Sequence, residues 1–167
     1  EARFLCSKTI MMSLQGIPAF YFNSLVGTSN DHEGVKKSGR ARSINRKKWQ
    51  ADELDRCLSS ESIHRRLFTE QVRLIRIRQG CSAFHPVSAQ EVLTPDDRVF
   101  AFRRRNPLTG ETVLCLSNMT GRPVEVEGIG TVAKNGYDLI SGETAGISGR
   151  IRINAYQTKW ILEQILR

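Results

Sequence analysis

The apolar positions at the N-terminal end follow first a helical and then a strand-like pattern. Apolar side chains recur through residues 3–14 without glycine or proline, which predicts a mostly buried helix that ends at Gly16 and Pro18. The run IPAFYF, residues 17–22, is apolar and aromatic, as in a buried strand. A helix, a turn and a buried strand in this order indicate the α-to-β half of an α/β unit.

The periodic pattern is lost between residues 24 and 48, where glycine, serine, asparagine and aspartate are followed by a basic run. This run, GRARSINRKKW at residues 39–49, contains five lysine and arginine side chains. A connection of about 25 residues is longer than most loops in compact domains, which marks it as functional or disordered. We expect a functional loop.

Helical periodicity returns in two further segments. A short helix is expected between Asp52 and Leu58, and a longer one in SSESIHRRLFTEQVRLIRIRQG, with Ser59 or Ser60 as its N-terminal cap and Gly80 as its stop. The apolar residues at helical spacing in the longer helix are Ile63, Leu67, Phe68, Leu74 and Ile75. The arginines that we interpret as its solvated face are Arg65, Arg66, Arg73, Arg76 and Arg78.

The pattern after Pro86 is that of strands. Short β-rich runs alternate with segments that carry turn residues, NPLTGE, MTGRP, KNG and SGETAG. The runs are VFAFRRR, TVLCLSNM, PVEVEG, YDLISG and GRIRINAYQTKWILE. Strands at this spacing predict a small antiparallel β-sandwich, so the fold class is α/β followed by all-β.

Composition places the 167 residues among ordinary globular proteins, with 40% hydrophobic and 25% charged residues. The formal net charge of +8 permits attraction to nucleic acid, an anionic membrane or a phosphorylated substrate, and chooses none of them. The N-terminal apolar stretch is interrupted by Lys8, Gln15 and Pro18, so it lacks the roughly 18 consecutive apolar residues of a membrane span. Because Glu1 occupies the place of a basic signal-peptide start, we expect a cytoplasmic protein, and the absence of an initial Met indicates a fragment.

The four cysteines are widely scattered, without a CxxC pair and without histidine at ligand spacing. We therefore expect neither a metal site nor a disulfide framework, and we interpret Cys6, Cys57, Cys81 and Cys115 as reduced and mostly buried. No residue pattern indicates a cofactor.

Two groups of motifs resemble one enzyme family. The tail YDLISGE with GRIRINAYQTKWILE is similar to the C-terminal β-domain of glycoside hydrolase family 13, the α-amylase superfamily. The final strand departs mildly from the family pattern, with Asn154 and Ala155 before Tyr156 where a proline is commoner. MMSLQGIPAFYFNSLVGTSND, followed by GRARSINR, resembles the last helix, strand and loop of the (β/α)8 TIM barrel in the branch of sucrose and glucosylglycerate phosphorylases.

The resemblance implies a domain division and a direction for the long loop. Residues 1–85 would form the C-terminal part of the catalytic barrel, comprising helix 7, strand 8 and helix 8, and residues 86–167 the antiparallel β-domain. In a (β/α)8 barrel the active site lies at the C-terminal ends of the strands, so the loop after Phe22 would reach it directly.

The resemblance also implies a set of sugar-binding residues. Arg46, the arginine of I-N-R, would pair with an aspartate on an early barrel strand and hold the glucosyl ring, since guanidinium and carboxylate groups together fix vicinal hydroxyls. Asp31, with Asn30 and Asn23, would shape the same pocket, and His32 would reach an acceptor or phosphate. Structural alternatives stay open. Asn30 and Asp31 fit a turn or helix cap, and Arg46 fits a solvated or ion-paired arginine. We interpret Lys36, Lys37, Lys47 and Lys48 as surface charges.

The implied reaction is retaining transfer of glucose from an α-glucoside to inorganic phosphate, which yields glucose 1-phosphate. It needs two carboxylates, a nucleophile and a general acid/base. In the resembled family these acids lie upstream of the segment that this chain matches, so we expect no catalytic residue here and an inactive isolated chain. Hydrolysis or transglucosylation in the same fold is an alternative, and a freestanding anion-binding or nucleic-acid-binding protein is another. The expected partners are an α-glucoside and phosphate, without nucleic acid or membrane, and the oligomeric state is open.

Overall fold

The fold was examined in a computed structural model, which describes residues 1–127, 129, 136–145 and 150–163. The chain divides into two compact units, and each is described by itself. Unit 1 contains Glu1 and residues 19–73, and unit 2 contains residues 2–18 together with residues 74–167. This division differs from the expected boundary between residues 85 and 86, which stays a prediction.

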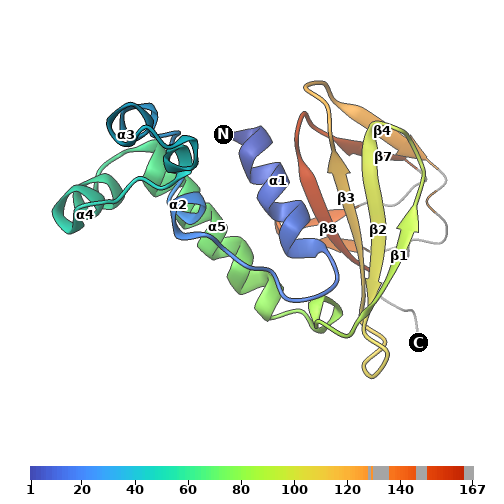
Figure 1. Cartoon of the computed structure of the whole chain (residues 1–167). Coiled ribbons are helices and arrows are strands. Elements are labelled where there is room, and N and C mark those ends of the chain that lie inside the picture. Colours follow the sequence, from blue (N-terminus) through green and yellow to red (C-terminus); the bar gives the residue numbers. More distant parts are fainter. Residues whose placement is uncertain (128, 130–135, 146–149, 164–167) are drawn as a thin grey trace. The chain divides into compact units, whose positions relative to one another are not determined.

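Unit 1 is helical (Figure 1). Its helices are α2 (Phe22–Leu25), α3 (His32–Ser38), the 3-10 helix η1 (Ala41–Asn45), α4 (Ala51–Ser59) and the first part of α5 (Ile63–Gln79). The expected short helix is confirmed by α4. The stretch from 24 to 48 is not the structureless loop that the lost periodicity predicted, because α3 and η1 give it local structure.

Helix α5 confirms the longer predicted helix, with two corrections. Its cap is Ser62 rather than Ser59 or Ser60, since the Ser62 Oγ accepts a hydrogen bond from the Arg65 N–H at 3.0 Å. Leu67 and Leu74 are buried as expected for the apolar face, and Phe68 and Ile75 are half-buried, whereas Ile63 is 45% exposed. Arg78, however, does not belong to the solvated face, because its guanidinium binds backbone carbonyl groups.

Residues 17–21 have no regular secondary structure, and Phe22 begins α2, so the predicted strand at 17–22 is wrong for this chain. Ile17 is 83% exposed, Tyr21 52% and Phe22 50%. A strand is defined by hydrogen bonds to a neighbour, and no neighbouring strand is present in the described part of the chain to pair with this segment. Composition indicated the apolar character of the segment but could not supply its partner.

Unit 2 is built on antiparallel strands. Within the described residues, one sheet has the order β1-β2-β3-β8-β5-β6, and β4 and β7 form a separate two-stranded ribbon. The strands are β1 (Ala89–Leu93), β2 (Val99–Arg105), β3 (Thr112–Asn118), β4 (Val124–Glu127), β5 (Gly136–Asp138), β6 (Glu143–Ala145), β7 (Arg150–Ile153) and β8 (Thr158–Glu163). All pairings are antiparallel, which confirms the predicted sheet type.

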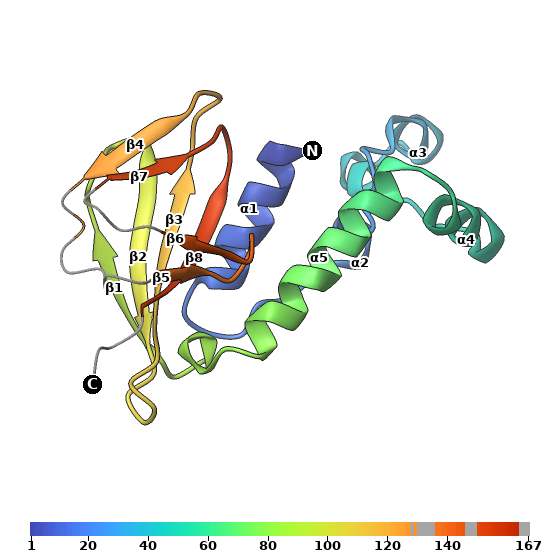
Figure 2. The ribbon, with the colours of Figure 1, turned by 180° about the vertical axis from the view of Figure 1, so that it is seen from behind.

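The hydrophobic core of unit 2 lies between the larger sheet and the β4–β7 ribbon, which crosses over its strands (Figure 2). Alternate residues of neighbouring strands point into it, as a pleated sheet requires. The buried members include Ala101, Leu114, Leu116, Val126, Ile153 and Ile161. Every residue of β3 is buried, because this strand lies between β2 and β8 in the middle of the sheet.

Two strands were missed and one predicted run is divided. β1 and β6 were not expected, because their sequences AQEVL and ETA lack a clear alternation. The long C-terminal run is split into β7 and β8 around Tyr156, whose φ of 53° interrupts the extended backbone. The predicted turn KNG lies mainly outside the described residues.

The aspartate of the D-L-I-S-G motif has a structural role. Asp138 is buried, and its Oδ1 accepts hydrogen bonds from the backbone N–H groups of Ile140 and Trp160, each at 3.1 Å. Its Oδ2 accepts a hydrogen bond from the Ser141 Oγ at 3.0 Å. Gly142 completes the turn with a φ of 76°, which favours glycine. The motif therefore connects the turn after β5 to the neighbouring strand β8.

The predicted N-terminal helix is confirmed by α1 (Ala2–Ser13), which lies against β3 and β8 in Figure 1. It is not mostly buried as predicted, because one face alone packs on the sheet, and its buried residues are Cys6, Thr9, Met12 and Ser13. Ser13 accepts a hydrogen bond from the Trp160 Nε1 at 2.7 Å. Trp160 also packs against Phe84, with ring centroids 4.7 Å apart. The helix thus covers the face of the sheet opposite the β4–β7 ribbon.

Two arginines bind the carbonyl groups at the C-terminal end of α1. Arg104 is 0% exposed and donates to the carbonyl oxygens of Ser13, His85 and Ser88 at 2.8, 3.0 and 3.3 Å. Arg78 likewise donates to the carbonyl oxygens of Met12, Gly16 and Phe84, at 2.8, 3.1 and 3.0 Å. These contacts join α1, the end of α5, the short 3-10 helix η2 (Ser82–Phe84) and strand β2.

Replacing Arg104 with methionine should lower the free energy of unfolding by at least about 2 kcal/mol, because the carbonyl groups of Ser13 and Ser88 lose a buried donor, whereas the His85 carbonyl keeps the Ser88 N–H. Urea denaturation of the chain measures this loss. Arg105→Met is the matched control, since Arg105 is the next residue of the same strand and is exposed, so its change should stay within about 0.5 kcal/mol. Equal losses for the two variants would contradict the structural role of Arg104.

Candidate functional site

The predicted residues Asn30, Asp31 and His32 lie at the start of α3. Asp31 is the N-cap of this helix, and its Oδ1 accepts a hydrogen bond from the Gly34 N–H at 2.8 Å. Asn30 and His32 are exposed, and neither side chain has a hydrogen bond to another described residue. The cap interpretation of Asp31 is therefore confirmed, while its second carboxylate oxygen, Oδ2, is the part that a ligand could use.

Gly34 has no room for a side chain because of this cap. A Cβ atom at position 34 would overlap the Oδ2 and Cγ of Asp31. Glycine at position 34 thus leaves room for the Asp31 carboxylate, which folds back over the first turn of α3. Any larger residue at this position would displace that carboxylate.

Arg46 follows η1 directly and lines an open hollow of about 410 Å³ with Tyr21 and Asn45. Its backbone N–H donates to the Ser43 carbonyl at 3.0 Å, and its residue surface is exposed. No ion pair to Arg46 occurs among the residues that the structure describes. The ion-pair alternative therefore has no support within the described residues, whereas the solvated alternative fits the exposed side chain and stays open.

Asn23 supports the backbone on both sides of Arg46. Its side chain is largely buried, and the Nδ2 lies 3.3 Å from the Asn45 carbonyl oxygen and 3.0 Å from the Lys47 carbonyl oxygen. The sequence indicated Asn23 as a sugar-binding group, but the structure gives its amide to the protein backbone. The sequence could not indicate this role, because Asn23 and its two acceptors are more than 20 residues apart and no local pattern links them.

The loop that carries Asp31 is joined to the segment that carries Arg46. The Asp31 N–H donates to the carbonyl oxygen of Ile44 at 2.5 Å, and the hydroxyl oxygens of Ser38 and Ser43 are 2.9 Å apart. α3 and η1 therefore form one local body, in which the capping carboxylate and Arg46 both belong to unit 1.

Lysine and tryptophan at the end of the basic run are held by neighbours. The Lys47 Nζ lies 2.8 Å from the Glu53 Oε1 and 3.7 Å from the centroid of the Trp49 ring. Trp49 donates its Nε1–H to the Thr28 Oγ1 at 2.9 Å and contacts His64 edge to face at 5.2 Å. The hydrogen bond from Lys47 lowers the pKa of Glu53. Lys47 is thus a partly exposed cation, with 34% of its side chain accessible, that binds a carboxylate and an aromatic ring.

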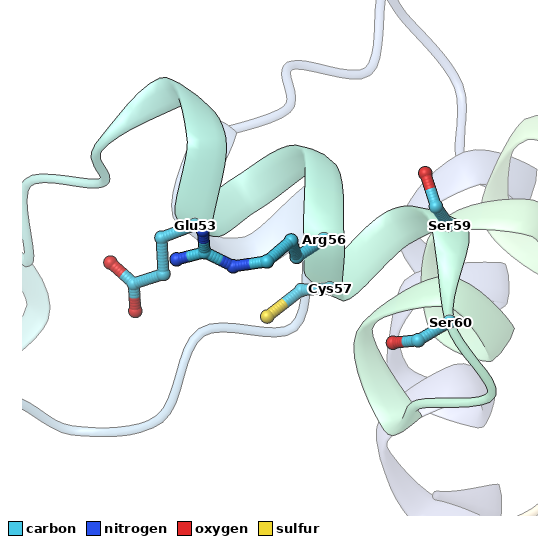
Figure 3. Close-up of a pocket in the computed structure, with 5 residues that line it drawn as sticks. All are labelled: Glu53, Arg56, Cys57, Ser59 and Ser60. Atoms are coloured by element: carbon cyan, nitrogen blue, oxygen red, sulfur yellow. The ribbon is translucent and has the colours of Figure 1, made fainter.

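A second hollow, of about 460 Å³, lies beside α4 and the turn that follows it (Figure 3). Its lining residues are Glu53, Arg56, Cys57, Ser59 and Ser60. The Arg56 side chain extends along α4 towards Glu53, and the Cys57 sulfur lies on the same side of the helix (Figure 3). Glu53 is the carboxylate among these lining residues, and it already binds Lys47. The lining includes no second acid to act with it.

The four cysteines are free thiols, as the sequence predicted. Cys6, Cys81 and Cys115 are buried, and Cys57 is half-buried. Burial, with the nearby charge of Glu111, raises the pKa of Cys81 to about 11. Burial raises the pKa of Cys115 as well. The described residues contain no group of three or more His, Cys, Asp or Glu side chains placed to hold a metal ion. None of the helices in the described ranges has the length and apolar composition to cross a membrane.

Comparison with known proteins gives relatives that are named as phosphorylases. No protein-family model matches the chain. A glucosylglycerate phosphorylase of Escherichia coli is 33% identical over 161 residues, which are 96% of this chain and 28% of the relative. A glucosylglycerate phosphorylase of Spirochaeta thermophila is 40% identical over 119 residues, 71% of this chain and 20% of the relative. The chain therefore spans between 20% and 28% of the length of these relatives.

The fold is that of solved α-amylase structures. The crystal structure of an Anoxybacillus α-amylase matches 99% of this chain and 33% of its own, with a TM-score of 0.72 and 16% sequence identity. At this identity the match establishes the fold alone.

Asp31 offers a test that separates its cap from a contact with a ligand. Asp31→Asn should keep the Gly34 hydrogen bond, whereas Asp31→Ala should lose it and destabilise α3 by about 1 kcal/mol. Amide hydrogen exchange across α3, with the NMR shift of the Gly34 N–H, measures this difference. If Asp31→Asn loosens α3 as much as Asp31→Ala does, the cap assignment is wrong.

Proposed function

Because this chain is homologous to glucosylglycerate phosphorylases and has the fold of a part of the α-amylase structures, we propose that it is the C-terminal portion of a glucosyl-transferring phosphorylase. The complete protein would transfer the glucosyl group of an α-glucoside to inorganic phosphate and release glucose 1-phosphate. The observation that carries this proposal is the 33% identity over 96% of the chain to an enzyme of that name.

The proposed role of Arg46 is to bind hydroxyl groups of the transferred sugar. A guanidinium presents five N–H donors in a rigid plane, which suits the paired oxygens of a pyranose. Arg46 is exposed at the hollow shared with Tyr21 and Asn45 and is not engaged by a described carboxylate. A carboxylate from another part of the complete protein would complete the pair, as charge-assisted hydrogen bonds are strongest when water is excluded.

Asn30, Asp31 and His32 would contribute to the same site from the start of α3. Asp31 would use its Oδ2, because the Oδ1 caps the helix. His32 and Asn30 are exposed and would meet the acceptor, phosphate or the group that leaves. The positive charge of the basic run agrees with an anionic acceptor, although Lys47 does not contribute because Glu53 neutralises it.

The two catalytic carboxylates would come from parts of the protein beyond these residues. Retaining transfer requires a nucleophile and an acid/base about 5 to 5.5 Å apart. The hollow at Arg46 is lined by no carboxylate, so the chain alone is expected to be inactive. In the complete protein, residues 1–85 would form the C-terminal part of the (β/α)8 barrel, and residues 86–167 its β-domain.

Hydrolysis and transglucosylation remain alternatives within the same fold, because an arginine that binds the sugar serves all three reactions. Among donors, the names of the relatives favour glucosylglycerate over sucrose. A cytoplasmic location also stays a prediction.

The test of the function is product analysis on the complete protein. It would be incubated with glucosylglycerate and with sucrose, each with and without inorganic phosphate, and glucose 1-phosphate and free glucose would be measured. We expect glucose 1-phosphate only when phosphate is present, with glucosylglycerate as the better donor. Free glucose at the same rate with or without phosphate would identify a hydrolase instead.

Arg46→Ala in the complete enzyme should lower kcat/KM by orders of magnitude without changing the melting temperature, because the exposed side chain supports no described contact of the fold. Arg65→Ala is the control. Arg65 is also an exposed arginine of unit 1, but it pairs with Glu61 on the surface of α5. Kinetics within about twofold of the wild type would remove Arg46 from the site.

A further inference from the structure

The amide of Asn23 binds two carbonyl groups that lie on either side of Arg46. Asn23 is 7% exposed, and its Nδ2 is within hydrogen-bond distance of the carbonyl oxygens of Asn45 and Lys47. The same nitrogen also lies 3.4 Å from the Tyr21 hydroxyl oxygen, which is farther than either carbonyl oxygen. A primary amide has two N–H donors, enough for both carbonyl groups. Both acceptors lie in the short stretch that carries the arginine, and no other described side chain bridges them.

We propose that Asn23 is a positioning residue for Arg46, a role that rests on the proposed sugar contact of Arg46. The Asn45 carbonyl belongs to the peptide group directly before Arg46, and the Lys47 carbonyl lies one residue beyond it. Fixing both restricts the backbone of the intervening residue, and with it the direction of its Cα–Cβ bond. The side chain itself stays exposed and available.

Asn23 is itself anchored. The Asn23 carbonyl accepts a hydrogen bond from the Thr28 N–H at 2.7 Å. The Gln71 Nε2 donates to the Leu25 carbonyl at 2.8 Å, which fastens α2 to α5. The Asn23 amide therefore connects α2, which is itself bound to α5, to the backbone on either side of Arg46.

The segment is also held beyond Arg46. Lys47 binds Glu53 on α4 and lies over the Trp49 ring, so the chain is fixed on both sides of the arginine. A side chain with fixed backbone and free head group loses less entropy when it binds, which is the general advantage of preorganisation. The structure thus combines a restrained backbone with an exposed guanidinium at one residue.

A double-mutant cycle in the complete enzyme tests this role. Asn23→Leu removes the donors with little change in size and should lower kcat/KM for the glucosyl donor at least about tenfold. In an Arg46→Ala background the same substitution should change kcat/KM by less than about twofold, because nothing remains to be positioned. A merely structural Asn23 would lower activity by the same factor in both backgrounds.

Asn106→Leu is the matched control. Asn106 is also 7% exposed and also binds a carbonyl through its Nδ2, that of Ser82 at 2.9 Å, but it lies in unit 2. It should lower the melting temperature and leave kcat/KM within about twofold of the wild type. If Asn23→Leu does not accumulate as folded protein, Asn23→Ser, which keeps one donor, carries the same cycle.

The outcomes for Asn23 and for the proposed function are separate. The wild-type products decide between phosphorolysis and hydrolysis, and the cycle is measured on whichever reaction the wild type performs. Non-additive effects of Asn23 and Arg46 support the positioning role even for a hydrolase. Additive effects, unchanged kinetics of Asn23→Leu, or unchanged kinetics of Arg46→Ala would each overturn it.

Discussion

The arrangement of unit 2 depends on two guanidinium groups that bind carbonyl groups where α1 ends. The last carbonyl groups of a helix lack intrahelical partners and carry the negative end of the helix dipole. Arg104 and Arg78 meet this requirement from β2 and α5, and they also bind the carbonyl groups around η2. Burial lowers the pKa of both arginines, but each has carbonyl oxygens that offset part of the lost hydration. This is why α1 and the end of α5 form a compact unit with the sheet.

Arg46 uses the same side-chain chemistry for the opposite purpose. Arg104 donates its hydrogen bonds to buried carbonyl groups of the fold. The guanidinium of Arg46 stays exposed, while its backbone is held by Asn23 and by the contacts of Lys47. The difference lies in the surroundings rather than in the residue type. Counting arginines in the sequence therefore cannot separate structural cations from candidate ligands, and the net charge of +8 is a poor guide to function.

The sequence predicted those features that depend on neighbours along the chain. The α1 and α4 helices, the Gly80 stop and the main strands follow from periodicity and turn residues, and all were found. The eighth barrel strand was not found, because a strand at 17–22 needs partners that composition cannot provide. The cap of α5 was missed because Ser59, Ser60 and Ser62 are equally good caps in sequence, and only the Arg65 hydrogen bond distinguishes them.

The candidate site was predicted from a resemblance, and its supporting residues were not. The I-N-R motif indicated Arg46, and a cap was one of the roles considered for Asp31. The buried role of Arg104 and the backbone contacts of Asn23 join residues 16 or more positions apart, and no local pattern records such pairs.

The separation between a restrained backbone and an exposed side chain has a physical consequence for Arg46. An exposed guanidinium exchanges hydrogen bonds with water at little net gain, so it would contribute little to the proposed sugar contact while the hollow is open. The same donors become stronger when surrounding protein excludes water and supplies an opposing carboxylate. Tyr21, which lines the hollow and is itself half exposed, is placed to be covered at the same time. The backbone of Arg46 is therefore held by this chain, whereas the strength of its proposed sugar contact would depend on groups that exclude water from the hollow.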